Sequence, residues 1–289
     1  MHLNQETAIE FVSEQEAARA MLLEAALLLN SKTIDYAVIG GWVPFLFNSS
    51  PISHPGTFDV DVVLNTAMSS AQVISALDEM VLKAGYMRAP KNAFQIYRNL
   101  RVNGEAMIFH VDFLHRKYAD DSGDLTRSWG RYQSITTPGT DVIFTKKETR
   151  SEVVSAMGTD GKPTSGKVTF ATEAGFLCAK GRSVGVGKRE RDAFDIYLVI
   201  AQSGDLEKLK ENSSRLMDDG VFCASMRRMF EEFATEKPAV KNAAKFLCGS
   251  SEEFRGRPGA AATEISHRVR KFLRDIDEQN DLADLYGPE

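Results

Sequence analysis

The segment FDVDVVLN places two carboxylates inside a pattern that otherwise predicts a buried strand. Alternate side chains of a strand share a face, so we expect Asp59 and Asp61 on one side, with Phe58, Val60 and Val62 facing the core. Strands disfavour aspartate, and neighbouring carboxylates that are buried without partners repel each other. A divalent cation relieves that repulsion, and carboxylate oxygens suit Mg²⁺ or Mn²⁺. The pair therefore predicts a metal site; the alternative is an exposed strand edge.

A second apolar segment, FHVDFLH, carries a single aspartate, Asp112, between apolar neighbours. If its strand pairs beside residues 58–64, Asp112 joins Asp59 and Asp61 on one face of the sheet. Three such carboxylates predict a two-metal site, with ions about 3.5–4 Å apart, that activates an attacking oxygen and stabilises a leaving phosphate. His110 shares this face. It orients Asp112 or contacts the substrate, or it is a half-buried structural histidine.

A double glycine lies upstream in YAVIGGWVPFLFN, directly after a short apolar strand. Gly40 and Gly41 lack side chains, so their backbone can approach a triphosphate closely, and a helix that begins there directs its N–H groups at the phosphates. Pro44 is compatible with such a helix only in its first turn. Thr57 is a further candidate phosphate contact. A Gly-Gly pair alone is typical of a turn, but the order of strand, glycines, helix and aspartate strand is more specific.

A basic segment, KGRSVGVGKRERD, interrupts an acidic chain. Lys180 or Lys188 is placed to contact a γ-phosphate or to neutralise the leaving pyrophosphate. The segment is not a Walker motif, because no strand precedes it and no GK[ST] follows. The next residues predict a helix in which Arg191 and Asp195 are four residues apart, a spacing that suits an ion pair, while Asp192 shares a face with Asp195. Two interpretations remain open here, a nucleotide pocket and a salt-bridged helix face.

Together, IGGW, TFDVDVVL and FHVDFL resemble the nucleotidyltransferase core of the DNA polymerase β superfamily. Its signature is Gly-Gly or Gly-Ser, then two carboxylates one residue apart, then a third carboxylate on a neighbouring strand. The stretch AGFLCAKGRSVGVGKRERDAFDIYLV is similar to the AbiEii/MenT-type toxin nucleotidyltransferases, which carry a helix lysine followed by a basic segment with two aspartates. The matching stretches span residues 36 to about 200. The resemblance implies that the helix lysine is Lys180 and that the basic segment comprises Arg189, Arg191, Asp192 and Asp195.

Two features depart from the family pattern. The connection NSSPISHPG between the glycines and the aspartates is longer than usual, which predicts an altered entry for the substrate. The spacer between Lys180 and the basic segment is shorter than usual.

The first 170 residues mix helix and strand patterns. A capping box formed by Ser13 and Glu16 begins the first helix, and Gly85 ends a second one. FQIYRNL and EAMIFHVDFLH predict a hairpin around RVNG, and YQSITT, DVIFTKK, EVVSAMG and KVTF predict further strands, with an exposed turn over residues 158–166. Later segments are helical. The expected fold is α+β: a polymerase-β-like core with a mixed sheet flanked by helices in residues 1–170, and a helical C-terminal domain in residues 171–289.

The composition narrows the class of protein. With 43% hydrophobic and 26% charged residues, the chain is typical of a soluble globular protein. No apolar run reaches the roughly 18 residues that span a bilayer, and the first residues lack the features of a signal peptide. Three distant cysteines predict neither a disulfide framework nor a zinc site, and favour the cytoplasm. The net charge of −5 argues against a globally basic nucleic-acid binder but leaves room for a local basic patch.

The predicted function is transfer of an NMP from an NTP to an acceptor hydroxyl, with Mg²⁺ or Mn²⁺ as cofactor. Asp59 and Asp61 hold both metals, and Asp112 binds one metal and helps to deprotonate the acceptor. The family resemblance implies a toxin of a toxin–antitoxin pair that acts on RNA such as tRNA, with an antitoxin protein as partner and no membrane partner. The nucleotide pocket is assigned to Gly40, Gly41, Thr57, Lys180, Lys188, Arg191, Asp192 and Asp195.

Two alternatives remain open. GGW followed by paired aspartates also resembles the aminoglycoside- and lincosamide-modifying nucleotidyltransferases, whose acceptors are small molecules. A catalytically silent nucleotide-binding module on the same fold is the second alternative, although it has no need to keep all three carboxylates.

Overall fold

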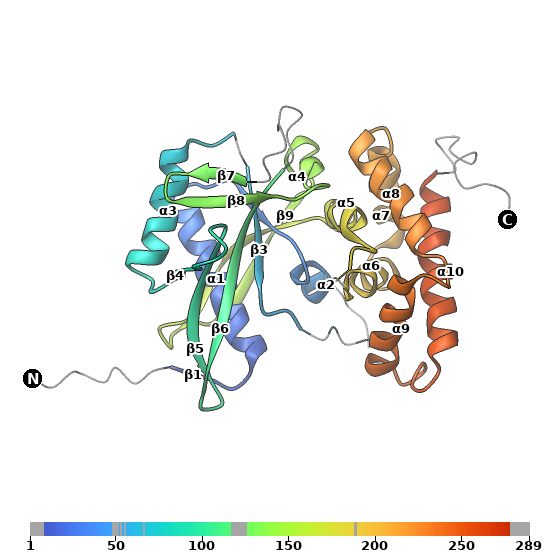
Figure 1. Ribbon diagram of the computed structural model, residues 1–289, viewed down its shortest axis with the longest axis horizontal. Coiled ribbons are helices and arrows are strands. Elements are labelled where there is room, and N and C mark those ends of the chain that lie inside the picture. Colours follow the sequence, from blue (N-terminus) through green and yellow to red (C-terminus); the bar gives the residue numbers. More distant parts are fainter. Residues whose placement is uncertain are drawn as a thin grey trace, which may run out of the picture. The chain divides into compact units, whose positions relative to one another are not determined.

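The computed structural model describes residues 9–47, 52, 54, 56–65, 67–116, 126–187 and 190–277 (Figure 1). The contacts within the chain divide it into two compact units. Unit 1 comprises Met1–Ile39, Gly56–Thr137 and Thr149–Phe170, and unit 2 comprises Gly40–Pro55, Pro138–Glu148 and Ala171–Glu289. Each unit is thus assembled from segments that are distant in the sequence. The separate domains expected over residues 1–170 and 171–289 remain a prediction.

Unit 1 is a mixed sheet with helices α1 (Glu14–Ser31) and α3 (Ser70–Leu82) packed on it. The strands follow the order β1-β5-β6-β3-β2-β10-β9, with β4 beside β5, β8 beside β6 and β7 beside β8. Parallel and antiparallel neighbours both occur, which confirms the expected α+β class with a mixed sheet. The strands are β1 (Glu10–Phe11), β2 (Tyr36–Val38), β3 (Val60–Leu64), β4 (Met87–Arg88), β5 (Gln95–Val102), β6 (Glu105–His115), β7 (Thr126–Trp129), β8 (Tyr132–Thr136), β9 (Thr149–Met157) and β10 (Pro163–Ala171).

Both helices of unit 1 begin with a serine cap. The Ser13 hydroxyl accepts the N–H of Glu16 at 3.2 Å, and Ser69 accepts the N–H of Gln72 at 3.4 Å. Apolar residues of α1 then recur at helical spacing and are buried against β3, β5, β6 and β9. One face of the sheet is therefore the core. The opposite face carries the alternate residues of β3, β5 and β6, among them the aspartates.

The β5–β6 hairpin has the register that its turn dictates. Asn103 and Gly104 take φ values of 49° and 85°, the two positive angles of a type I′ turn, in which Asn-Gly is favoured. Val102 then pairs with Glu105, and the ladder continues to Gln95 opposite Asp112. The predicted hairpin is confirmed.

Two expectations for residues 140–170 need correction. The segment DVIFTKK was expected to form a strand but contains a short helix, α4 (Asp141–Thr145), because Val142 and Ile143 are buried on one side of a single helical turn. The exposed turn expected over 158–166 is limited to 158–162, since β10 already begins at Pro163. The strands on either side of this turn, β9 and β10, are confirmed.

Unit 2 is helical in the part of the chain that the structure describes (Figure 1). Its longer helices pack through buried apolar residues such as Phe176, Phe194, Phe222, Leu247 and Leu273. Within the described ranges, no helix has both the length and the apolar character required to cross a membrane. The helices are α2 (Trp42–Phe47), α4, α5 (Glu173–Ser183), α6 (Asp192–Ala201), α7 (Leu206–Leu216), α8 (Gly220–Glu232), α9 (Pro238–Ser250) and α10 (Pro258–Asp277).

Candidate active site

The three carboxylates expected to bind metal lie on adjacent strands of unit 1. Strands β3 and β6 run parallel, and their register places Asp61 opposite Asp112. Asp59 directly precedes β3, and it lies close enough to Asp112 for its charge to act on that carboxyl, which places it on the same side as Asp61 and Asp112. Asp61 and Asp112 are half-buried and Asp59 is exposed. The strand pairing on which the predicted carboxylate cluster depends is confirmed.

The carboxylates interact through their charges. Loss of hydration on burial, followed by the negative charge of Asp61, raises the pKa of Asp112 to about 7, and Asp59 adds a smaller effect in the same direction. Gln95 opposes this shift, because its Nε2 donates a 2.7 Å hydrogen bond to Asp112 Oδ1. The cluster therefore contains a repulsion that a bound cation would relieve.

The donor set fits a hard cation. Among the described residues, no three His, Cys, Asp or Glu side chains converge closely enough to form a protein cage for a metal ion as they stand. Mg²⁺ does not require such a cage, since it usually keeps several waters and binds through one or two carboxylates together with substrate phosphates. Carboxylate oxygens from Asp59, Asp61 and Asp112 suit this mode of binding, whereas a soft metal would prefer sulfur or imidazole ligands.

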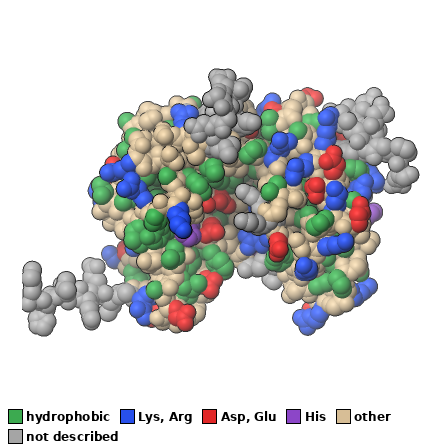
Figure 2. Space-filling model, in the orientation of Figure 1, with side chains coloured by type: hydrophobic (Ala, Val, Ile, Leu, Met, Phe, Trp, Pro, Cys, Tyr) green, Lys and Arg blue, Asp and Glu red, His purple; other side chains and the backbone are tan. Residues whose placement is uncertain are grey.

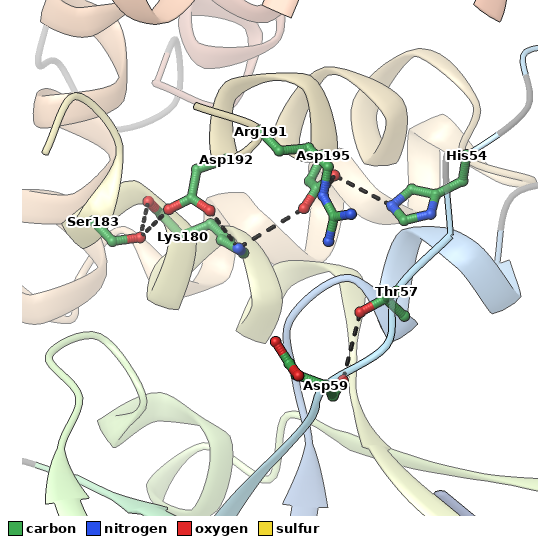
Figure 3. Close-up of polar contacts among 8 residues, drawn as sticks. All are labelled: His54, Thr57, Asp59, Lys180, Ser183, Arg191, Asp192 and Asp195. Atoms are coloured by element: carbon green, nitrogen blue, oxygen red, sulfur yellow. Dashed lines mark hydrogen bonds and ion pairs between the residues drawn. The ribbon is translucent and has the colours of Figure 1, made fainter. Parts of the chain in front are cut away.

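The segment that leads into β3 is held against α1. The backbone N–H of Thr57 donates to Gln15 Oε1 at 3.2 Å, and a Cβ at Gly56, whose φ is 93°, would collide with the same oxygen. Thr57 is buried, and its hydroxyl donates a long 3.5 Å bond to the carbonyl oxygen of Asp59 (Figure 3). Its expected contact with phosphate remains a prediction.

Phe58 does not face the core as the strand pattern suggested. Its side chain is 42% exposed, whereas Val60 and Val62 are fully buried as expected. The regular strand begins only at Val60, so the alternation that places Val60 and Val62 in the core does not extend back to Phe58.

The double glycine follows the end of β2. Ile39, the last residue of unit 1 before the glycines, donates its N–H to the carbonyl oxygen of Asp61 at 3.0 Å. Gly40 takes a φ of 72°, which an L-residue with a side chain adopts only with strain. Helix α2 then starts at Trp42 with Pro44 in its first turn, as predicted. A phosphate-binding role for Gly40 and Gly41 stays a prediction.

Unit 2 contains the carboxylates and cations of the predicted basic segment. The Lys180 ammonium on α5 donates to Asp192 Oδ1 at 2.5 Å and lies 3.8 Å from Asp195 Oδ2 (Figure 3). The hydroxyl of Ser183, also on α5, donates to the other oxygen of Asp192 at 2.7 Å. Asp192 is therefore held by α5 while it forms the first turn of α6.

Asp195 is the centre of a second set of contacts. It is fully buried, and burial by itself would raise its pKa, yet the pKa lies below the ordinary value. The causes of the lowering are the bond from His54 Nε2 to Oδ1 at 3.2 Å and the positive charges of Lys180 and Arg191. Arg191 Nε lies 3.4 Å from Oδ1, the ion pair that the four-residue spacing predicted. Lys180, Arg191, Asp192 and Asp195 thus form one internal network.

Besides Ser183, the sequence did not indicate a second partner of these carboxylates, His54. Its side chain is only 3% exposed and meets the ring of Phe45 edge-on, with centroids 5.9 Å apart. No spacing rule links His54 to Asp195, which is 141 residues away. Gln95, by contrast, could have been found, because counting back from the Asn-Gly turn places it opposite Asp112.

The structure therefore groups the predicted site residues into two sets. Asp59, Asp61 and Asp112 lie together in unit 1, and the ion-pair network lies in unit 2. Two residues of the basic segment, Lys188 and Arg189, lie outside the described residues.

Comparison with known proteins gives little further constraint. No protein-family model matches the chain, and no curated protein matches it. Among solved structures, the chain is similar to an antigenic nucleotidyltransferase-like protein from Paracoccidioides brasiliensis. The identity is 18%, the TM-score is 0.42, and the likeness covers 74% of this chain and 94% of that one. A likeness of this size carries no argument about function.

Proposed function

We propose that the chain is a metal-dependent nucleotidyltransferase that moves an NMP from an NTP to an acceptor hydroxyl. The observation that carries the proposal is the parallel pairing of β3 and β6, which sets Asp112 opposite Asp61 and on the same face as Asp59. The raised pKa of Asp112 is a second support: burial is its largest cause, and the negative charges of Asp61 and Asp59 act in the same direction. A surface that serves only solubility does not require half-buried carboxylates that repel one another.

In the proposed reaction, the acceptor oxygen forms a bond to the α-phosphorus of the NTP, and the bond from that phosphorus to the pyrophosphate oxygen breaks. Asp59 and Asp61 would hold two Mg²⁺ or Mn²⁺ ions, and Asp112 one of them. When bound, the ions supply positive charge for the attacking oxygen and the leaving pyrophosphate. Asp112 accepts the proton of the acceptor hydroxyl, and Gln95 keeps its carboxylate oriented through Oδ1.

The network of unit 2 is proposed to position the nucleotide-binding residues. Lys180 and Arg191 face two buried carboxylates, so neither is a simple surface cation. Contact of Lys180 with a phosphate would exchange one carboxylate oxygen for a phosphate oxygen at the same ammonium group. The phosphate contacts of Gly40, Gly41, Thr57 and Lys188 belong to the proposal on the strength of the family resemblance.

The resemblance to AbiEii/MenT-type enzymes supports RNA, such as tRNA, as the acceptor, in a toxin of a toxin–antitoxin pair. A small-molecule acceptor is the second candidate, supported by GGW followed by the paired aspartates. The experiment that separates them incubates the protein with Mg²⁺ and each α-³²P-labelled NTP, together with total tRNA or with a panel of aminoglycosides and lincosamides. Label in the RNA supports the first candidate, and label in a small molecule supports the second. Tight NTP binding that does not depend on Mg²⁺, without transfer to any acceptor, would favour the silent module.

A further inference from the structure

The outer edge of β5 has a gap between its two neighbouring strands. On the edge away from β6, β4 pairs with β5 up to Tyr97, and β1 pairs with it from Arg101 onward. The N–H of Ala89 donates to the carbonyl oxygen of Gln95 at 3.0 Å, so every second residue from Gln95 onward directs its backbone N–H and carbonyl groups away from β6. The backbone groups of Asn99 therefore point into the gap.

A cavity of about 950 Å³ lies at this gap. Residues 98–101 of β5 line it, together with residues 83–85 after α3, Glu24 of α1 and residues 159–161 of the turn between β9 and β10. Figure 1 shows this turn beside β5. The turn also packs on Ile9, which precedes β1, since a Cβ at position 161 would stand 3.2 Å from Ile9 Cγ1. The cavity has the size of a small-molecule site.

Arg98 places a guanidinium in this cavity on the side of β5 that faces the core. Its neighbours two residues away in the strand are apolar and buried. Arg98 Nη1 donates to the two oxygens of Glu24 at 3.0 and 2.8 Å and to Thr159 Oγ1 at 3.0 Å. The guanidinium also lies 5.8 Å from the ring centroid of Tyr86. Groups from three parts of unit 1 thus hold the guanidinium in one orientation.

The other donors of Arg98 stay available to a ligand. In the described part of the chain, Nε and Nη2 have no hydrogen-bond partner, and neither atom is buried. The side chain is 22% exposed and lines the cavity. Gly85 leaves this edge of the guanidinium uncovered, because a Cβ there would lie 4.0 Å from Arg98 Nε. Parallel N–H groups on one edge of a guanidinium bind a carboxylate or a phosphate through two hydrogen bonds.

The charges around the cavity favour an anion. Three cations line it, Lys83, Arg98 and Arg101, against two carboxylates, Glu24 and Asp160. Arg98 neutralises Glu24, and the balance of three to two leaves an excess of positive charge in a chain whose net charge is −5. On the face drawn in Figure 2, the Lys and Arg side chains of the described residues are dispersed among acidic ones. The cavity instead brings three cations to one place.

From these features we infer that the cavity binds a small molecule through an oxyanion group, a phosphate or a carboxylate. The Nε–Nη2 edge of Arg98 and the backbone N–H of Asn99 contact the oxyanion. Lys83 and Arg101, both exposed at the cavity, add positive charge.

This site is separate from the proposed active site. Gln95 lies opposite Asp112, and Arg98 follows Gln95 by three residues, so its side chain belongs to the other face of the sheet. The inference therefore stands or falls independently of the proposed nucleotidyl transfer.

The test locates binding by NMR. The assigned backbone amide signals and the arginine Nε–H signals of the full chain are followed while inorganic phosphate or succinate is added, with sodium chloride keeping the ionic strength constant. We expect saturating shifts of the Arg98 Nε–H and Asn99 amide signals with at least one of the two anions. Saturation with phosphate alone identifies a phosphate ligand, and saturation with succinate alone identifies a carboxylate. Saturation with neither anion, or shifts confined to the Asp61 and Asp112 amides, would overturn the inference.

Two sets of variants test the contacts. An exposed ionic contact contributes up to about fivefold in affinity, so Lys83→Gln combined with Arg101→Gln is expected to weaken binding of the effective anion about fivefold. Lys91→Gln removes an exposed cation outside the cavity and should stay within about twofold of the wild type. Arg98→Lys keeps the charge but loses the parallel donors, and should abolish the saturating shift of the Asn99 amide. If Arg98→Lys fails to fold, the double variant decides, and wild-type affinity in it would overturn the inference.

Discussion

Replacement of Asp195 by asparagine removes one buried negative charge while keeping the shape of the side chain. The carboxylate is fully buried, accepts a bond from His54 at 3.2 Å, and lies 3.4 Å from Arg191 Nε and 3.8 Å from the Lys180 ammonium. Breaking a buried ion pair from one side costs about 3–5 kcal/mol. Lys180 keeps Asp192 at 2.5 Å, so we expect the lower end, a loss of about 3 kcal/mol in the free energy of unfolding.

The loss of stability in Asp195→Asn should depend on pH. The pKa of Asp195 lies below its ordinary value in the folded protein, while an unfolded aspartate titrates near about 3.9. The stabilisation by Asp195 is therefore fully present above the unfolded pKa and is lost as the pH falls through the lower, folded pKa. The difference between the wild type and Asp195→Asn should stay constant from pH 8 to about 5 and shrink below about pH 4.

Urea unfolding followed by circular dichroism at 222 nm measures both effects, because the network lies among the helices of unit 2. Asp275→Asn is the matched control. Asp275 is part-exposed on α10 and pairs with Lys271 at 2.9 Å and Lys210 at 3.0 Å, so its loss should cost about 1 kcal/mol or less. A cost for Asp195→Asn no larger than that of the control, or a difference that persists unchanged below pH 4, would refute the buried ion-pair network.

Three further predictions concern single positions. Gly40→Ala should lower the free energy of unfolding by about 1–2 kcal/mol, because the φ angle of Gly40 is 72°. Gly41 has no positive φ, so Gly41→Ala should cost less, and thermal unfolding of the two variants compares them. Lys180→Met removes the ammonium that Asp192 and Asp195 share and should lower the free energy of unfolding in urea by about 3 kcal/mol. Asp192→Asn in the same chain should restore part of this loss, and additive losses of the two variants would contradict the contact. Gln95→Leu removes the bond that lowers the pKa of Asp112, so that pKa should rise above about 7 in metal-free protein by ¹³C NMR, and an unchanged value would count against the bond.

Local rules predict part of the carboxylate cluster. Alternation predicts Asp59 and Asp61 on one face, although the regular strand includes only Asp61, and the Asn103–Gly104 turn fixes the ladder that brings Gln95 opposite Asp112. The parallel pairing of β3 with β6 is not local, but apolar neighbours on both strands leave the aspartates the same free face. These parts of the fold follow from period and turn chemistry.

Other parts of the fold depend on long-range contacts that the periodic pattern of apolar residues does not encode. His54 reaches Asp195 across 141 residues, and the burial of both could not be read from either segment. Phe58 is exposed because the regular strand starts two residues later than the apolar pattern suggested. Residues 141–145 form a helix although Val142, Ile143 and Phe144 favour strands, since tertiary burial overrides a weak local preference.

The central claim is tested most directly by comparing transfer from NTPs labelled at two different phosphates. Wild-type protein with Mg²⁺ is given an acceptor and either α-³²P- or γ-³²P-labelled NTP, and the label in the acceptor is counted. The account predicts transfer of the α label alone, its loss in Asp61→Asn, and wild-type transfer in Asp160→Asn, where the aspartate is exposed on the turn between β9 and β10. Equal transfer of the α label by Asp61→Asn and the wild type would contradict the assignment of the active site.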